Sequence, residues 1–323
     1  MKQESREGQL WGLVLAAGDG TRVRSFLSQL CSNRGIKQFC AIVGPRTMLA
    51  HTLARAEMLI PRQRILIVVS ADHQPEIAQH LAHWPKENVI VQPANRDTTA
   101  GILLPLAHIA RRDPHALVTV FPSDHFIANE QGFITSVKLA IEETRLFPES
   151  FVLLGMKPDR LENGYGWIEP VGEKSDRFTQ SVARFWEKPV WSQAQILWQK
   201  GALWNSFVCV TYCRTLWEMV RLAVPDIYLH FLEIYQALGT PAAQRVTKRI
   251  YNCLRAINFS SGVCEPWAPM LRVLPVPDVG WSDWGSVDRI VATVEQLGKK
   301  NELLARLNRS EPKAVQTEIC IAV

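Results

Sequence analysis

Two glycines and two arginines follow an apolar run near the N-terminus, in the stretch LVLAAGDGTRVRSF of residues 13–26. Gly18 and Gly20 can adopt backbone conformations that other residues avoid, and they let backbone N–H groups approach a ligand closely. Such N–H groups bind phosphate, and Arg22 would add positive charge beside them. The residue types therefore indicate a loop that binds a phosphorylated ligand.

Three kinds of glycine-rich phosphate loop can be compared with this stretch. A dinucleotide-binding loop needs a third glycine, where this chain has Val23, and an acidic residue about 20 positions later. Residues 42–43 are apolar instead. A Walker A loop needs Gly-Lys-Ser/Thr, which is absent here. A nucleotidyltransferase loop would place Arg22 on a triphosphate and add a later lysine, for which Lys37 is the candidate. The alternative without function is a tight strand-to-helix turn with surface arginines.

Four further motifs carry polar side chains at the expected ends of strands. FPSDHFI contains Asp124, RFWEKPV contains Glu187 and Lys188, LWNSFVCV contains Asn205, and DVGWSDWGSVD contains Asp283. Carboxylate oxygens suit a hard cation such as Mg²⁺. A single aspartate at a strand end is more often a turn former or a helix cap, so neither aspartate is assigned on its own.

The elements that must position these residues follow from the apolar pattern. Over the first half, strands are predicted at residues 11–16, 65–69, 89–92, 116–121 and 151–154, with helices at 48–59, 74–83, 100–111 and 130–144. This alternation favours a Rossmann-like α/β fold, with a mostly parallel sheet covered by helices on both faces. Ligands bind beyond the carboxyl ends of the strands in such sheets, which is where the motifs lie.

The second half has a less regular pattern. Strands are predicted at 164–171, 178–186, 202–212 and 271–276, helices between 215 and 255, and a closing helix at 288–307. The simplest organisation is one α/β domain over residues 1–290, followed by a helix and tail over 291–323.

Composition narrows the classes of protein. The 323 residues carry a net charge of +5 without a stripe of lysine and arginine, which suits an anionic substrate and argues against nucleic acid. The seven cysteines include no C-x-x-C pair, so neither a disulfide framework nor a zinc knuckle is expected. The polar N-terminus and the lack of a long apolar run predict a cytoplasmic protein that does not contact a membrane.

Eight motifs in order connect this chain to a known family. They are LAAGDGTR, KQF, QPANRDTTAGI, PSDHFI, NGYGWIE, EKP, WNSFVCV and GWSDWGS, spread over residues 15–286. With them the chain resembles the sugar-1-phosphate nucleotidylyltransferases, and KQF, WNS and GWSD point to their mannose-1-phosphate guanylyltransferase branch. The resemblance implies that GTP and α-D-mannose 1-phosphate give GDP-mannose and pyrophosphate. A phosphate oxygen of the sugar phosphate would attack the α-phosphate in line, assisted by Mg²⁺.

The resemblance also implies roles for individual residues. Gly18, Gly20, Thr21 and Arg22 would hold the triphosphate, Lys37 would contact the α-phosphate, and Lys188 would bind the phosphate of the sugar. Asp124 and Asp283 would be the Mg²⁺ ligands. The sugar pocket, in a smaller mixed insertion over roughly 156–280, would contain Gly166, Glu169, Glu187 and Asn205. The base would lie against Ala16, Ala17, Gln92, Asn95 and Arg96.

The sequence departs from the family pattern at a few positions. Ile36 replaces the proline usual before the loop lysine, residues 23–36 form a longer loop, and Ala17 replaces a glycine. Two alternatives therefore stay open: the same chemistry with another nucleotide or hexose 1-phosphate, and a regulator that binds a sugar nucleotide without catalysis. No isomerase activity is expected, because the chain is too short for the additional domain of some relatives. Whether the protein is a homodimer is also left open.

Overall fold

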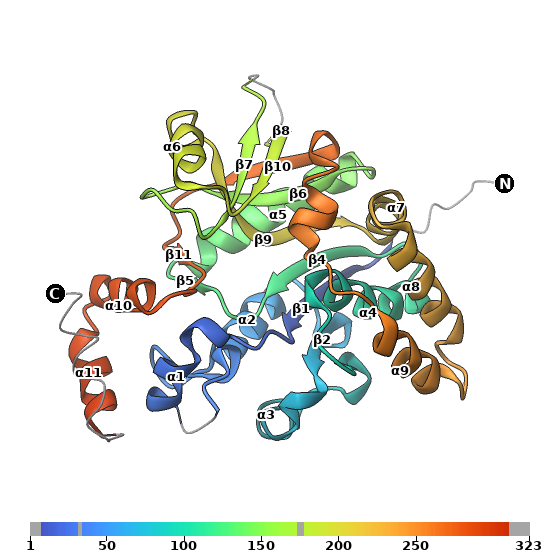
Figure 1. Ribbon diagram of the computed structural model, residues 1–323, viewed down its shortest axis with the longest axis horizontal. Helices are drawn as coiled ribbons and strands as arrows, with labels where there is room; N and C mark the ends of the chain where they lie inside the picture. The colour runs from blue at the N-terminus through green and yellow to red at the C-terminus, as the bar shows by residue number, and fades with distance from the viewer. Residues whose placement is uncertain (1–7, 32–33, 173–177, 310–323) are drawn as a thin grey trace.

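A nine-stranded sheet runs through the computed structural model of the chain, which describes residues 8–31, 34–172 and 178–309 (Figure 1). Its order is β3-β2-β1-β4-β9-β6-β10-β8-β7. These strands are β1 (Leu10–Ala16), β2 (Ile65–Ser70), β3 (Val89–Gln92), β4 (Leu117–Pro122), β6 (Phe151–Met156), β7 (Gly166–Pro170), β8 (Gln180–Glu187), β9 (Leu203–Tyr212) and β10 (Leu271–Val276). A separate two-stranded sheet pairs β5 (Phe126–Ile127) with β11 (Trp281–Ser282).

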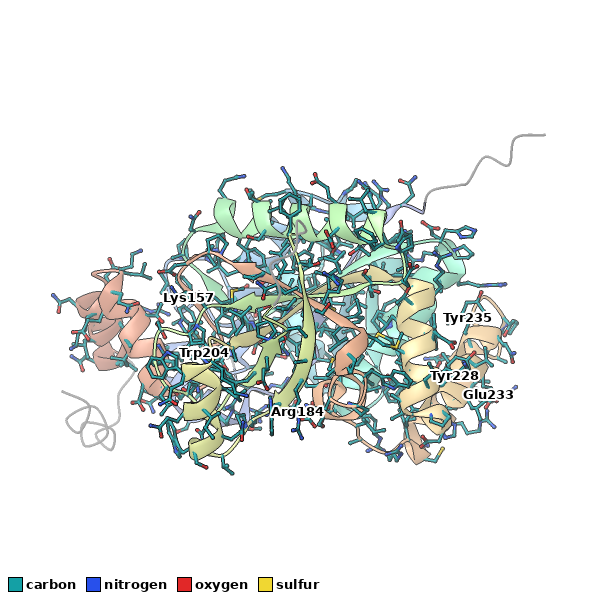
Figure 2. The ribbon with its side chains drawn as sticks, turned by 90° about the horizontal axis from the view of Figure 1, so that it is seen from above. Lys157, Arg184, Trp204, Tyr228, Glu233 and Tyr235 are labelled. Carbon is teal, nitrogen blue, oxygen red and sulfur yellow. The ribbon has the colours of Figure 1, made fainter. Side chains whose placement is uncertain are left out.

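Helices connect the strands and cover the sheet. They are α1 (Arg24–Leu30), α2 (Met48–Glu57), α3 (Gln74–His80), α4 (Asp97–Arg112), α5 (Glu130–Leu146), α6 (Trp191–Gln199), α7 (Cys213–Ala223), α8 (Pro225–Ala237), α9 (Ala243–Cys253), α10 (Val287–Gln296) and α11 (Lys300–Arg309). Figure 2 shows α8, with Tyr228 and Tyr235, on the side of the molecule opposite α10 and α11. Trp204 lies toward α10 in the same view.

Both faces of the central sheet are buried, which explains the unbroken apolar runs of its strands. Successive side chains of a strand point to opposite faces. In β1, Leu13 belongs to a core shared with α4, α7, α8 and α9, while Val14 belongs to a second core shared with α2, α5 and α6. Both side chains are fully buried. The predicted α/β fold, with helices on both faces of the sheet, is confirmed.

The strand β9 gives the sheet its mixed character. The strands β3, β2, β1 and β4 are parallel, and β9 then pairs antiparallel with both β4 and β6. The strands β7 and β8 of the expected insertion do not form a separate layer, because β8 pairs with β10 and β7 with β9. The region predicted to bind the sugar is thus a direct continuation of the main sheet.

The C-terminal helices return to the N-terminal part of the chain. The predicted single helix at 288–307 is wrong: α10 ends before Gly298, whose φ of 69° interrupts the helix. Helix α11 then lies beside α1 (Figure 1). Arg306 donates hydrogen bonds to the carbonyl oxygens of Leu30, Ala41 and Ile42. Within the described ranges, no helix combines the length and the hydropathy needed to cross a bilayer.

Candidate active site

The glycine loop after β1 is held by the motif KQF. Gln38 donates from its Nε2 to the carbonyl oxygens of Ala16 and Gly18, at 2.8 Å each. Gly20 has a φ of 57°, and a Cβ at this position would lie 3.1 Å from the Cβ of Lys37. Glycine is therefore required here by both its backbone angle and its close contact with Lys37. This packing buries Lys37 and fixes the start of its side chain against the loop.

The first of two cavities at the carboxyl ends of the strands lies over this loop. It measures about 620 Å³, and its walls include Ala17, Gly18, Gly20, Thr21, Gln92 and Asn95. We call it the glycine-loop cavity. Gln92 is buried, and its Oε1 accepts no hydrogen bond from the described residues. A buried acceptor without a partner is costly, so this atom is suited to a donor on a bound ligand.

The second cavity adjoins the first along Gly18, Leu15 and Thr98, which line both. It measures about 300 Å³, and its walls include Arg22, Asp124, Asp283, Lys188, Glu187 and Asn205, together with Gly166. We call it the aspartate cavity. The side chains predicted to converge from distant motifs therefore do line one cavity.

The small β5–β11 sheet brings the two aspartates together. Asp124 precedes β5 and Asp283 follows β11, and Phe126 pairs with Ser282 across the two strands. The rings of Phe126 and Trp284 stack with their centroids 4.7 Å apart, which holds the two turns against each other. Both strands are only two residues long, too short for an alternation of apolar and polar residues to reveal them.

Lys37 links the two aspartates. Its Nζ lies 2.9 Å from Asp124 Oδ2, and it also donates a hydrogen bond to the backbone carbonyl oxygen of Asp283. Burial by itself raises the pKa of Asp124, but the positive charge of Lys37 outweighs it and holds that pKa below the ordinary value. The pKa of Asp283 is lowered in the same way, against its burial, by Lys37 and Arg289. Both carboxylates are therefore charged at neutral pH.

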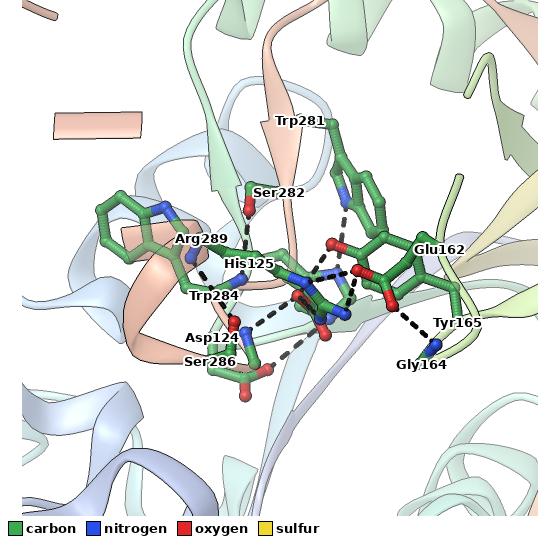
Figure 3. A network of polar contacts seen from close by, with 12 residues as sticks. Asp124, His125, Glu162, Gly164, Tyr165, Trp281, Ser282, Trp284, Ser286 and Arg289 are labelled. Carbon is green, nitrogen blue, oxygen red and sulfur yellow. Dashed lines mark hydrogen bonds and ion pairs between the residues drawn. The ribbon is translucent and has the colours of Figure 1, made fainter. Parts of the chain in front are cut away.

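A dense network of polar contacts holds Asp283, and Figure 3 labels two of its partners, Tyr165 and Arg289. Its Oδ1 accepts hydrogen bonds from Tyr165 Oη at 2.9 Å, from the Gly285 N–H at 2.8 Å and from Arg289 Nη1 at 2.8 Å. Trp284, between Asp283 and Gly285, has a φ of 46°, a strained angle for a side chain of its size. Packing around the fully buried indole ring holds the backbone of Trp284 in this strained conformation.

Four of the predicted residues do not line either cavity: Lys37, which is buried beneath them between the two aspartates, and Arg96, Glu169 and Ala16. Arg96 donates from its Nε to the Tyr251 carbonyl oxygen at 2.8 Å, so its guanidinium is turned toward α9. Glu169 Oε1 lies 2.7 Å from Lys200 Nζ. Ala16 is fully buried and contributes its carbonyl oxygen to Gln38. The described residues contain no group of three or more histidine, cysteine, aspartate or glutamate side chains that could hold a metal ion.

Comparison with known proteins assigns the family. Residues 11–300 match the family described as nucleotidyl transferase. The chain belongs to the nucleotidyl transferase family. The predicted family membership is confirmed.

Relatives of this nucleotidyl transferase point to one branch. It is 29% identical over 290 residues to the mannose-1-phosphate guanylyltransferase ManC of Salmonella typhimurium, covering 87% of this chain and 58% of that protein. It is also 29% identical to the mannose-1-phosphate guanylyltransferase of Escherichia coli K12, over 87% of this chain and 59% of that protein. The chain thus spans less than two thirds of these relatives. A Thermus thermophilus structure described as a mannose-1-phosphate geranyltransferase superposes with a TM-score of 0.77 at 25% identity, covering 89% of this chain and 79% of that one.

Sequence reasoning missed one part of this nucleotidyl transferase site. The guanidinium of Arg289 reaches both Asp283 and Glu162 and lies over the ring of Tyr165, with its carbon 4.2 Å from the ring centroid. Tyr165 lies in the motif NGYGWIE and Glu162 directly precedes it, so the sequence could have indicated that both residues belong to the site. Arg289 follows the last motif on a helix, where a charged residue is ordinary.

Proposed function

We propose that this nucleotidyl transferase converts GTP and α-D-mannose 1-phosphate to GDP-mannose and pyrophosphate. The observation that carries the proposal is the aspartate cavity, where Arg22, Lys188, Asp124 and Asp283 surround the space next to the glycine loop. The names of the relatives from Salmonella and Escherichia support mannose 1-phosphate and a guanine nucleotide as substrates. We expect the reaction to take place in the cytoplasm.

The residues present fit a magnesium ion. Magnesium prefers a small number of carboxylate ligands and completes its shell with phosphate and water. Asp283 Oδ1 already accepts three hydrogen bonds, whereas no described donor reaches Oδ2, so one oxygen is free for a cation. Lys37 Nζ pairs with Asp124 Oδ2 and with the Asp283 carbonyl oxygen, so a bound ion would share the pocket with this ammonium group. Asp124 and Asp283 would hold the ion, which would neutralise charge on the phosphates and the transferring group.

Side chains of the site would position the two substrates for the reaction. The attacking phosphate oxygen of the sugar phosphate is anionic near neutral pH, so no general base is required. Arg22 would bind the departing pyrophosphate, and Lys37 would contact the α-phosphate. Lys188, whose φ of 47° turns the chain sharply after Glu187, would bind the sugar phosphate. Fixed cations that bring anions together and stabilise the transferring charge account for catalysis of this kind.

Gln92 supports a guanine base. Guanine presents N–H donors at N1 and N2, and the unpaired Gln92 Oε1 is an acceptor on the wall of the glycine-loop cavity. A donor from the base would satisfy the buried oxygen, which adds selectivity for guanine over a base with an acceptor at that place.

A substrate matrix tests the proposal. The purified chain is incubated with Mg²⁺ and each combination of four nucleoside triphosphates with mannose, glucose and N-acetylglucosamine 1-phosphates, and pyrophosphate release is measured. We expect the highest kcat/KM for GTP with mannose 1-phosphate. A higher value for another pair would replace the proposed substrates. Binding of GDP-mannose without exchange of labelled pyrophosphate would identify a regulator instead of an enzyme.

A further inference from the structure

Arg289 is the least expected residue of the site. It lies in the first turn of α10, beyond the last sequence motif, and only 9% of its side chain is exposed. Its Nη1 lies 2.8 Å from Asp283 Oδ1, and its Nη2 lies 2.6 Å from Glu162 Oε2. Its Nε donates to the same glutamate oxygen at 3.1 Å. One guanidinium therefore joins two carboxylates that are far apart in the sequence.

The Asp283 end of this bridge determines which carboxylate oxygen is available. Arg289, Tyr165 and the Gly285 N–H all donate to Oδ1. Gly285 packs closely against this carboxylate, because a Cβ there would lie 2.5 Å from Asp283 Oδ2 and 3.0 Å from Arg22 Nη2. The three donors on one oxygen thus hold the Asp283 carboxylate in one orientation.

The Glu162 end of the bridge orders the loop before β7. Glu162 Oε1 accepts a hydrogen bond from the Gly164 N–H at 2.8 Å, and its carbonyl oxygen accepts one from Trp167 Nε1 at 2.9 Å. This segment carries Tyr165 and Gly166, which line the aspartate cavity. Arg289 therefore contacts, through Glu162, the loop that would face the sugar.

We propose that Arg289 is a positioning residue that locks the Asp283 carboxylate and the Glu162–Gly166 loop into one rigid unit. This inference rests on the proposed function for its kinetic readout. Arginine suits the role because its planar fork donates in two directions at once, whereas a lysine ammonium is a single point. A bridge that holds reacting groups in place contributes to the rate even though it touches no substrate.

The test compares Arg289→Met, Arg289→Lys and a matched control. Arg221→Met breaks an exposed arginine–carboxylate pair with Glu218 on α7, outside the site. We expect Arg289→Met to lower kcat about 100-fold and to raise KM for mannose 1-phosphate, with KM for GTP changed less than about 3-fold. We expect Arg289→Lys to recover less than a tenth of the wild-type kcat, and Arg221→Met to match wild type.

A second readout does not depend on catalysis. Hydrogen exchange of peptides covering 160–168 and 281–286 should become at least about 10-fold faster in Arg289→Met, and not in Arg221→Met, well below the unfolding temperature. Unchanged exchange in both peptides, or a kcat within twofold of wild type, would overturn the positioning role. If wild type makes no GDP-mannose, the proposed substrates are wrong, and the exchange measurement still decides the role of Arg289.

Discussion

The glycine-loop cavity and the aspartate cavity share one edge of the sheet but are built differently. The first presents backbone, small residues and an unpaired acceptor on Gln92. The second is surrounded by ion pairs, in which Lys37 contacts Asp124 and Arg289 contacts Asp283. The glycine loop offers backbone N–H donors, whose positions are set once Gln38 holds the loop backbone. Carboxylates and long cations must be fixed by partners before they can act together.

This difference predicts how the two regions respond to change. Substitutions of the two carboxylates in the aspartate cavity should affect the rate strongly, because each one removes a charge from a fixed set of ion pairs. Substitutions in the glycine-loop cavity should mainly affect nucleotide affinity, because each one removes a single contact to a ligand. The following experiments test that contrast, from the largest expected effect to the smallest.

Removing one charge from the aspartate cavity should have the largest effect. For Asp283→Asn and for Asp124→Asn we expect kcat to fall about 1,000-fold with the fold retained, since a lost cation ligand costs several kcal/mol of transition-state stabilisation. Steady-state kinetics measures kcat, and circular dichroism tests whether the fold is retained. Asp226→Asn, which alters an exposed pair with Arg255, is the control. Wild-type rates in both site variants would refute the assignment of the two aspartates.

Substitution of Lys188 should weaken binding of the sugar phosphate without affecting binding of GTP. Its side chain is 54% exposed and its Nζ lies 3.1 Å from Glu187 Oε1, so its removal should leave the fold intact. We expect Lys188→Ala to raise KM for mannose 1-phosphate about 30-fold, the value of one charged hydrogen bond. KM for GTP serves as the internal comparison, and Lys300→Ala as the control variant. An unchanged KM for mannose 1-phosphate would exclude Lys188 from the site.

Mild acid should destabilise the protein through buried histidines rather than through the aspartates. Burial lowers the pKa of His51, His73, His80 and His125, and the largest shift with a defined size belongs to His108 on α4, the helix that starts at the glycine-loop cavity. Burial, with a smaller contribution from Arg112, lowers the pKa of His108 from 6.5 to about 4. The unfolded state therefore binds a proton more readily, so stability is complete above pH 6.5 and falls as the pH decreases toward 4. The pKa values of Asp124 and Asp283 are lowered, so the stability that these carboxylates contribute is lost only as the pH falls below about 3.8.

Urea unfolding at pH 7 and pH 5 measures this effect. We expect wild type to lose about 2 kcal/mol between the two values through His108. The variant His108→Gln has no proton to bind and should lose correspondingly less. Equal losses in the two proteins would show that His108 is not the group responsible.

Substitution of Gln92 should have the smallest effect on the kinetics. For Gln92→Leu we expect KM for GTP to rise about 5-fold, close to the value of one neutral hydrogen bond, with kcat nearly unchanged. The discrimination between GTP and ATP should decrease by the same factor. Gln131→Leu, at an exposed position on α5, is the control. A large fall in kcat would contradict the contrast between the two cavities.

Much of the fold could be predicted from local patterns. The strand predicted at 271–276 coincides with β10, and the first four predicted strands agree with β1 to β4 within a residue or two. These strands are buried on both faces and therefore form continuous apolar runs. The order of the sheet could not be predicted, because insertion of β9 between β4 and β6 depends on long-range pairing.

The candidate site divides in the same way. Arg22, Asp124, Lys188, Asn205 and Asp283 were predicted because they lie in short motifs, and all of them line one cavity. Arg96 and Glu169 come from equally good motifs, yet their side chains are paired with Tyr251 and Lys200 elsewhere. A motif specifies a residue type at a position in the chain, but the direction of a side chain depends on the neighbours that compete for its hydrogen bonds.

The sequence by itself determined the α/β class, the glycine loop and the charged groups available for phosphate chemistry, because each follows from residues within a few positions of one another. Only the tertiary structure decided that β5 and β11 bring the two aspartates together and that Arg289 joins Asp283 to Glu162. Those contacts connect segments more than a hundred residues apart. Their geometry is set by packing of the whole chain, which no local pattern records.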